Sequence, residues 1–147
     1  MSSSFEIIVI FDPAKPDESR VYSSLLGLIR ISGVSALILV IKVENIIIES
    51  LSRIGLKAEI SNEHHGIFIE KKNELYKIAS IGMKFKKWIS FHGFSLNIDP
   101  DLENYKGIRP CGLNNNLVTS VKNEGITIEK EIIDDILIDE IKNHFLK

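Results

Sequence analysis

Three strand-like segments that follow one another closely limit the folds open to this chain. They span Gly66 to Glu70, Leu75 to Met83 and Trp88 to Asn97, and each contains isoleucine or aromatic residues of the kind enriched in strands. Only residues 71–74 separate the first two segments, so we expect a tight hairpin that continues into a third strand. A meander of this kind must be covered on one face, so nearby helical segments should share its core.

Two segments have the spacing of amphipathic helices and can provide that cover. Apolar residues from Val43 to Ile54 recur at three and four positions, and Gly55 follows where a left-handed C-cap favours a residue without Cβ. The segment Glu131 to Phe145 repeats a large apolar residue every four positions from Ile133 onward. Both segments are therefore predicted to be helices.

The remaining segments give weaker signals. Phe5 to Phe11 favours a strand, Val21 to Ile31 fits either a helix or a strand, and the apolar run Ala36 to Ile41 favours a fully buried strand. Short strands are also predicted at Leu56 to Ile60 and Gly125 to Ile128, and Asp99 before Pro100 predicts a helical turn at Leu102 to Tyr105.

Composition indicates the class of protein and its compartment. The chain has 147 residues, 26% of them charged and 44% hydrophobic, as in a soluble globular domain. A net charge of -2 gives no reason to expect nucleic acid or a membrane as a partner. A single cysteine cannot form an internal disulfide, which fits the cytoplasm. Arg30 interrupts the longest apolar stretch, Val21 to Ile41, which argues against a membrane span.

Cys111 lies between Pro110 and Gly112 in the segment G-I-R-P-C-G-L, a context that presents a side chain at a tight turn. A thiol becomes a nucleophile where a cation or backbone N–H groups favour its thiolate form. A lone cysteine can instead act as a small hydrophobic residue that fills a gap, and the turn leaves the two interpretations about equally favoured.

Lys77 lies in the apolar run L-Y-K-I-A-S-I-G. Strand alternation predicts that it shares a face with Leu75, Ala79 and Ile81, where it would either snorkel at an edge of the sheet or be buried. If it is buried near Cys111, its positive charge would lower the pKa of the thiol, and the amine could carry protons.

Two further groups of side chains favour ordinary roles. His64 and His65 precede Gly66 and could form a metal pair, but no other ligand has suitable spacing, so we expect a plain loop and no metal. The segment K-F-K-K-W at 84–88 is favoured as a solvated strand edge, with a docking patch for an acidic partner as the alternative.

Several blocks, taken in order, closely resemble the octanoyltransferase (lipoate-protein ligase B) family. They are K-I-A-S-I-G, W-I-S-F-H-G-F-S-L-N, D-L, G-I-R-P-C-G and L-V-T-S-V, and the resemblance covers about residues 43–147. It implies an α/β (α+β) fold with a mixed sheet and flanking helices, similar to the catalytic fold of lipoate and biotin protein ligases. The family's R-G-G and H-G-P-G-Q motifs do not occur here. We therefore expect one domain over residues 1–147, N-terminally truncated relative to the family, with residues 1–42 unmatched.

The resemblance also implies an activity. The family moves an octanoyl group from octanoyl-acyl carrier protein to a lysine of lipoyl domains, through a cysteine thioester and without a cofactor. The acceptors are lipoyl domains of 2-oxoacid dehydrogenases and the glycine cleavage H protein. Cys111 matches the acyl-accepting cysteine, and Lys77 matches the lysine that lowers the thiol pKa and transfers protons. The residues that match the substrate-binding segments are Ser80, Ile81, Gly82, Gly93, Phe94 and Ser95.

Two other interpretations stay open. The chain could be a catalytically inactive remnant that at most binds acyl carrier protein or a lipoyl domain, since the two N-terminal motifs are absent. It could also be an ATP-dependent lipoate or biotin ligase. The Pro-Cys-Gly sequence around Cys111 argues against that third interpretation, because such ligases need no cysteine.

Overall fold

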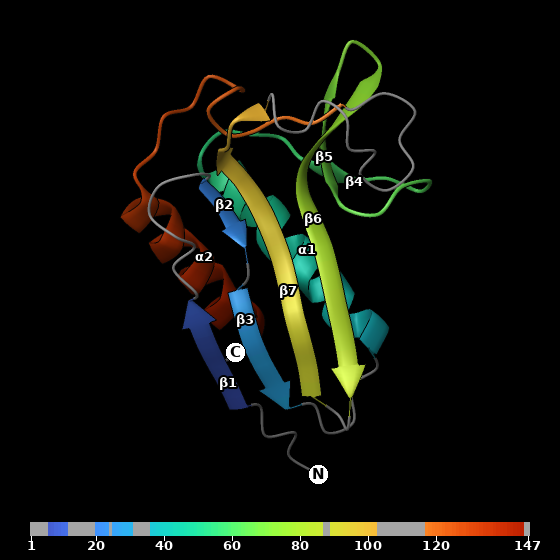
Figure 1. The fold of residues 1–147 in the computed structure, drawn as a ribbon, viewed down its shortest axis with the longest axis vertical. Coiled ribbons are helices and arrows are strands. Elements are labelled where there is room, and N and C mark those ends of the chain that lie inside the picture. Colours follow the sequence, from blue (N-terminus) through green and yellow to red (C-terminus); the bar gives the residue numbers. More distant parts are fainter. Residues whose placement is uncertain are drawn as a thin grey trace.

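A computed structural model describes the backbone of residues 6–11, 20–23, 25–30, 36–86, 89–102 and 117–145, with side chains described for 36–85, 93–102 and 117–145. Within these ranges the strands form one seven-stranded sheet, and two helices pack beside it (Figure 1). The strands are β1 (Glu6–Phe11), β2 (Arg20–Ser23), β3 (Leu25–Arg30), β4 (Glu59–Ile60), β5 (Ile67–Lys71), β6 (Glu74–Lys86) and β7 (Ile89–Asp99). The helices are α1 (Ala36–Arg53) and α2 (Lys130–Phe145).

The sheet has the order β1-β3-β7-β6-β5-β4, and β2 pairs with β7 beside β3. Each of these strand pairs is antiparallel, and a parallel bridge joins Lys77 to Val118. The predicted meander is confirmed as β5-β6-β7. Lys72 and Asn73 form the two-residue turn of its first hairpin, and their positive φ angles of 52° and 62° match the turn type whose twist suits a hairpin.

The predicted helix from Val43 to Ile54 is confirmed as part of α1, and its C-terminus has the expected cap. Gly55 has a φ of +88°. The N–H of Gly55 donates to the carbonyl of Ser52, and the N–H of Leu56 donates to that of Leu51, each at 3.0 Å. This pair of bonds is a Schellman motif, which satisfies carbonyls that would otherwise be left unpaired at the helix end.

The predicted buried strand at Ala36 to Ile41 is wrong, because these residues form the first turns of α1. Leu39 is buried and continues the helical stripe of Val43, whereas Leu37 is 68% exposed. A short apolar run does not by itself distinguish a buried strand from a helix. Here the run joins the periodic segment without a breaking residue, so the helix extends back through it.

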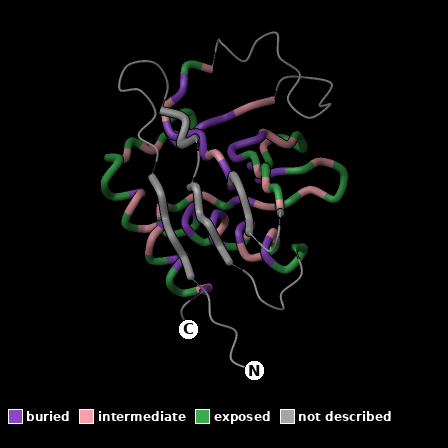
Figure 2. Tube along the Cα trace, turned by 60° about the horizontal axis from the view of Figure 1, so that its bottom comes forward, coloured by how far each residue is buried: buried purple, intermediate pink, exposed green. Residues whose placement is uncertain are grey.

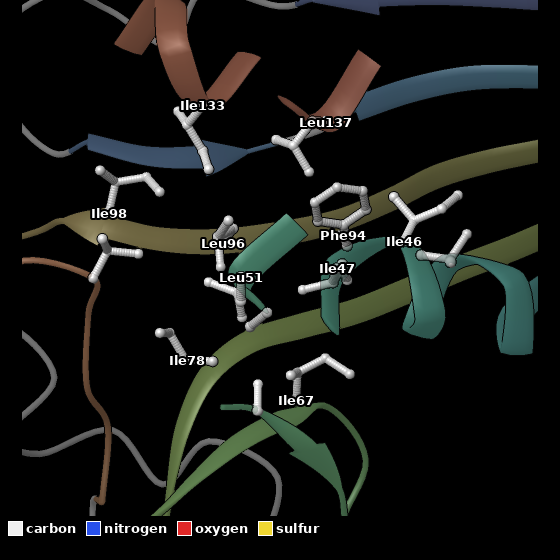
Figure 3. Close-up of a cluster of buried hydrophobic side chains, with 14 of the residues drawn as sticks. Ile46, Ile47, Leu51, Ile67, Ile78, Phe94, Leu96, Ile98, Ile133 and Leu137 are labelled. Atoms are coloured by element: carbon white, nitrogen blue, oxygen red, sulfur yellow. The ribbon is translucent and has the colours of Figure 1, made fainter. Parts of the chain in front are cut away.

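Helix α2 confirms the prediction for Glu131 to Phe145. Its buried apolar residues contact the same cluster as those of α1 and of the sheet, as Figure 3 shows around Phe94 and Leu96. Buried positions recur along both helices and alternate with exposed ones (Figure 2). The core therefore lies between one face of the sheet and the two helices, which satisfies the amphipathic pattern of both.

Other sequence predictions are confirmed only in part. The strand at Phe5 to Phe11 is confirmed as β1, and the ambiguous segment from Val21 to Ile31 forms strands β2 and β3. The strand at Leu56 to Ile60 is reduced to β4. Gly125 to Ile128 forms no strand, because Gly125 ends a turn at φ +86° and the chain then enters α2 without a sheet partner. The turn predicted at Leu102 to Tyr105 lies mostly outside the described residues.

Neither helix of the described ranges combines the length and the apolar character that crossing a bilayer requires.

Candidate active site

Lys77 is buried rather than snorkelling at an edge of the sheet. The residue is only 2% exposed, and its Nζ has no hydrogen-bond partner among the described residues. The Nζ lies 5.6 Å from the centre of the Phe68 ring, within reach of a cation–π attraction. An ammonium buried without a hydrogen bond is costly, so a position of this kind is a candidate for function.

A β-bulge decides which face of the sheet Lys77 occupies. Ile67 pairs with Ala79, but the next residue, Phe68, pairs with Lys77, so Ile78 is an extra residue in β6. Ile78 and Ala79 both belong to the core that faces the helices, whereas Lys77 and Phe68 lie outside that cluster. Strict alternation would have put Lys77 on the face of Ala79, and this expectation is wrong because of the bulge.

After the bulge, alternation in β6 is regular. Ile81 packs partly against the helix-side core, while Ser80 and Gly82 are exposed. Because the bulge reverses the alternation between residues 77 and 80, Lys77 and Ser80 share the face that points away from the helices. We call this surface the site face, defined by Lys77, Phe68, Ser80 and Gly82.

The two segments predicted to bind substrate lie side by side. Ser80 pairs with Ser95, Ile81 with Phe94, and Gly82 with Gly93 across β6 and β7. Directly opposed residues of an antiparallel pair point to the same side. Ser95 and Gly93 therefore join the site face, while Phe94, which is buried, packs into the helix-side core.

Residues 117–122 bind both strands beyond the last pair between β6 and β7, which is Ala79 with Leu96. The N–H of Lys77 donates to the carbonyl of Leu117 at 2.8 Å, and the N–H of Thr119 donates to the carbonyl of Lys77 at 2.9 Å. Further along, Val121 donates to Asn97 at 2.9 Å. The chain that follows the cysteine segment is thus fixed to the backbone of Lys77.

Side chains hold the same segment in place. The Nδ2 of Asn97 donates to the carbonyl of Thr119 at 3.1 Å, and the hydroxyl of Thr119 donates to the carboxylate of Glu124. Lys71 pairs with that carboxylate at 2.7 Å, and the Nδ2 of Asn123 donates to the hydroxyl of Thr119 at 3.1 Å. Thr119 and Asn97 are both buried, so these bonds satisfy groups that water cannot reach.

The structure does not describe every residue that the sequence singles out. Cys111 and the tight turn predicted around it lie outside the described residues. The sequence interpretation gave no role to Asn97 or Thr119. Thr119 is part of the quoted L-V-T-S-V block, and its place there is the signal that pointed to it.

Among the described residues, one group of three metal-ligand side chains lies close together, on the two helices rather than on the site face. Glu49, Glu140 and His144 have ligand atoms within 4.8 Å of one another, on helices α1 and α2. His144 pairs with Glu49 at 2.9 Å, and Arg53 pairs with Glu140 at 3.1 Å. The hydrogen bond between His144 and Glu49 and the ion pair between Arg53 and Glu140 account for the group as a contact between the two helices.

Comparison with known proteins identifies the class to which this fold and this strand arrangement belong. The sequence profile described as "Lipoyl protein ligase A/B catalytic domain" matches residues 35–147. The match begins ahead of Val43, where the quoted motifs place the start of the resemblance. The chain belongs to the lipoyl protein ligase A/B catalytic domain family, whose members are transferases and ligases.

Curated relatives make the assignment more specific. The octanoyltransferases of Rickettsia rickettsii (strain Sheila Smith) and Rickettsia africae (strain ESF-5) are each 43% identical to the chain over 103 residues. Those residues are 69% of this chain and 49% of each relative. The octanoyltransferase of Rickettsia canadensis (strain McKiel) is 42% identical over 103 residues. The chain therefore spans about half the length of the curated relatives it matches.

A solved structure shows the same fold. Ta0514 of T. acidophilum, provisionally assigned as a lipoate protein ligase and solved with bound lipoic acid, has a TM-score of 0.57 and 16% identity to this chain. The match covers 86% of this chain and 49% of that one. The predicted α/β (α+β) fold, with a sheet and flanking helices similar to lipoate ligases, is confirmed. The described strand pairs are antiparallel, and the parallel element of the predicted mixed sheet is the bridge between Lys77 and Val118.

Proposed function

We propose that this chain is an octanoyltransferase of lipoate biosynthesis, which moves an octanoyl group from octanoyl-acyl carrier protein to a lysine of lipoyl domains. Its membership of the family and its 43% identity to octanoyltransferases support this activity. The acceptors would be lipoyl domains of 2-oxoacid dehydrogenases and the glycine cleavage H protein. The proposal includes a cytoplasmic location, where these proteins and a reduced thiol would coexist.

The observation that carries the proposal is the state of Lys77. Its ammonium is buried on the site face without a hydrogen-bond partner among the described residues, and its backbone binds Leu117. Leu117 follows Cys111 by six residues, a stretch that reaches at most about 22 Å. The thiolate of Cys111 would supply a negative charge to pair with the Lys77 ammonium. The ammonium would in turn raise the fraction of Cys111 that is present as thiolate.

The chemistry then proceeds in two steps. The Cys111 thiolate attacks the thioester carbonyl of the octanoyl carrier, the bond between that carbonyl and the carrier sulfur breaks, and the carrier leaves as a thiol with a proton from the Lys77 ammonium or from solvent, which leaves Lys77 neutral for the second step. A neutral lysine amine of the lipoyl domain next attacks the thioester on Cys111. An amide forms, the Cys111 thiolate leaves, and the amine proton passes to Lys77 or to solvent. The carrier thioester is already activated, so the reaction needs no ATP.

The remaining predicted site residues are proposed to bind the acyl chain and the carrier arm. Ser80, Gly82, Gly93 and Ser95 would contribute from the site face, where they pair across β6 and β7. Ile81 and Phe94 would shape the site from the opposite side of the same strands. We also propose that residues 1–147 act as one domain, because β3 joins β7 in the same sheet.

The test is the intact mass of the protein after incubation with octanoyl-acyl carrier protein. An octanoyl adduct is expected on the wild-type protein, and it should be absent from Cys111→Ala. Addition of a lipoyl domain should discharge the adduct and add the same mass to that domain. Wild-type protein that stays unmodified while the carrier remains charged would contradict the proposal.

Two parallel measurements separate the alternatives. Bound lipoic acid in the Ta0514 structure favours an ATP-dependent ligase as the second candidate, so the lipoyl domain is also incubated with lipoic acid and ATP. Transfer under those conditions, together with no thioester on Cys111, would favour ligase activity. Binding to the carrier protein without transfer under either condition would favour the inactive binding role.

A further inference from the structure

Gly66 lies directly against the side chain of Lys77. A Cβ added at Gly66 would be 2.7 Å from the Cε of Lys77, 3.3 Å from its Nζ and 2.7 Å from the carbonyl oxygen of Ala79. Gly66 also has a φ of +124°, in the region that favours glycine. The residue is itself buried. The space that a methyl group would take is therefore occupied by the end of the lysine side chain.

Phe68, two residues later, forms the other boundary of that space. Its ring is fully buried and its centre lies 5.6 Å from the Nζ of Lys77. The ring of His64 lies 6.4 Å from the Phe68 ring between ring centres, tilted by 51°. Gly66 and Phe68 thus enclose the outer part of the lysine from the start of β5, while the bulge in β6 directs it towards them.

We propose that Gly66 and Phe68 are positioning residues for the acyl-transfer reaction, because together they fix the place of the Lys77 ammonium on the site face. This inference rests on the proposed function, which makes Lys77 the proton-transferring group. A side chain with four rotatable bonds has many rotamers, and the described residues offer the Lys77 ammonium no hydrogen bond that would select one. Contact with the Gly66 backbone and with the face of the Phe68 ring limits the rotamers of Lys77 instead.

The decisive experiment is a double-mutant cycle in the full chain, using Gly66→Ala, Lys77→Ala and the double variant. The new methyl group meets the Ala79 carbonyl in both backgrounds, so that clash cancels in the cycle, whereas the lysine end can rotate and should be displaced. Gly66→Ala should then lower the melting temperature strongly in the wild-type background and clearly less in the Lys77→Ala background. This readout depends on the contact alone and does not require the protein to be an octanoyltransferase.

The catalytic readout is steady-state octanoyl transfer to a lipoyl domain. A displacement of about 1 Å at a reacting group can cost on the order of 100-fold in rate. Gly66→Ala is therefore expected to lower kcat by about 10- to 100-fold with little change in the KM for the carrier. In the Lys77→Ala background the same change should have no further effect on kcat, because no lysine remains to be displaced.

Gly55→Ala is the matched control. Gly55 has a similar left-handed conformation, at φ +88°, but no atom lies within 4 Å of an added Cβ. Gly55→Ala also adds a Cβ at a positive φ, but without contact with Lys77 or with a carbonyl. Its melting temperature should fall by the same amount with or without Lys77, and kcat should stay at the wild-type value.

A second variant keeps the proposal testable if Gly66→Ala fails to fold. Phe68→Leu retains an apolar side chain and removes the ring face, and it should lower kcat several-fold with an unchanged KM. Additive melting temperatures in the cycle would overturn the proposal, as would wild-type kcat in Gly66→Ala or Phe68→Leu. If no variant, wild type included, forms the thioester, then the proposed function fails, while a non-additive cycle would still support the Gly66–Lys77 contact.

Discussion

The side-chain amide of Asn97, on β7, donates a 3.1 Å hydrogen bond to the carbonyl of Thr119, and both residues are buried. The bond joins the end of the meander to the segment that also binds Lys77. We predict that Asn97→Leu lowers the free energy of unfolding by about 1 to 3 kcal/mol, because it leaves a buried carbonyl without its side-chain donor. Urea denaturation measures the change. An unchanged midpoint would show that this bond contributes nothing to stability.

The buried ammonium of Lys77 is expected to cost stability. Lys77→Met keeps an unbranched apolar stem and removes the charge. In a Cys111→Ala background, which lacks the proposed counter-charge, it should therefore raise the free energy of unfolding by about 1 to 3 kcal/mol. In the wild-type background Lys77→Met should lose acyl transfer. Denaturant unfolding and the intact-mass assay measure the two effects, and destabilisation by Lys77→Met in the Cys111→Ala background would indicate that Lys77 has another stabilising partner.

Lys77 is also predicted to raise the reactivity of Cys111. Removal of a neighbouring positive charge makes the thiolate less populated, so Lys77→Ala should slow alkylation by iodoacetamide at neutral pH by about tenfold. Lys84→Ala, which changes an exposed lysine on the same strand, is the control and should react at the wild-type rate. Equal alkylation rates in all three proteins would exclude a close contact between Lys77 and Cys111.

Helix α1 offers a matched pair of leucines for the core. Leu51 is fully buried between the helices and the sheet, whereas Leu37 is 68% exposed. Leu51→Ala should lower the free energy of unfolding by about 2 to 5 kcal/mol, and Leu37→Ala should change it by no more than about 0.5 kcal/mol. Chemical denaturation of both variants tests the difference. A large loss in Leu37→Ala would mean that the start of α1 is covered.

Substitutions in the turn between β5 and β6 are predicted to raise the stability of the protein. Lys72 and Asn73 both have positive φ angles, and the sequence Asn-Gly fits that geometry with less strain. Changing Lys72→Asn together with Asn73→Gly should raise the melting temperature by a few degrees. Lys72→Val, which places a β-branched residue at the same angle, should lower it. The opposite order of melting temperatures would contradict the turn type.

Much of the fold is encoded in local patterns. Helical spacing and a terminal glycine predict the end of α1 at Gly55, and a regular four-residue repeat predicts α2. The apolar run from Ala36 to Ile41 favours a strand in the sequence, because an unbroken apolar run has no periodicity that distinguishes a helix from a buried strand. Gly125 to Ile128 also has strand-like composition, but a strand forms only where another strand is available to pair with it.

The candidate site was harder to predict from the sequence than the fold, because its geometry depends on how strands pair. The side on which Lys77 lies depends on Ile78 having no partner in β5, and no residue of β6 alone reports that bulge. Gly66 had a sequence signal, a glycine between two histidines and a β-branched run, but its contact with Lys77 arises only when β5 and β6 pair. Lys77 and Cys111 were predicted from their local contexts, an apolar strand and a Pro-Cys-Gly turn, while their catalytic roles were predicted only through the family resemblance.

The position of β6 between two hairpins has a consequence for insertions and deletions. Its register is set once by the turn at Lys72 and Asn73, and again by the connection to β7. If a residue were lost from either connection, the register of β6 with β5 and its register with β7 would no longer be compatible. The strand would have to form or remove a bulge, and either change turns the amine at position 77 to the other side of the sheet. Length changes in turns remote from the reacting atoms should therefore abolish acyl transfer while leaving the protein folded.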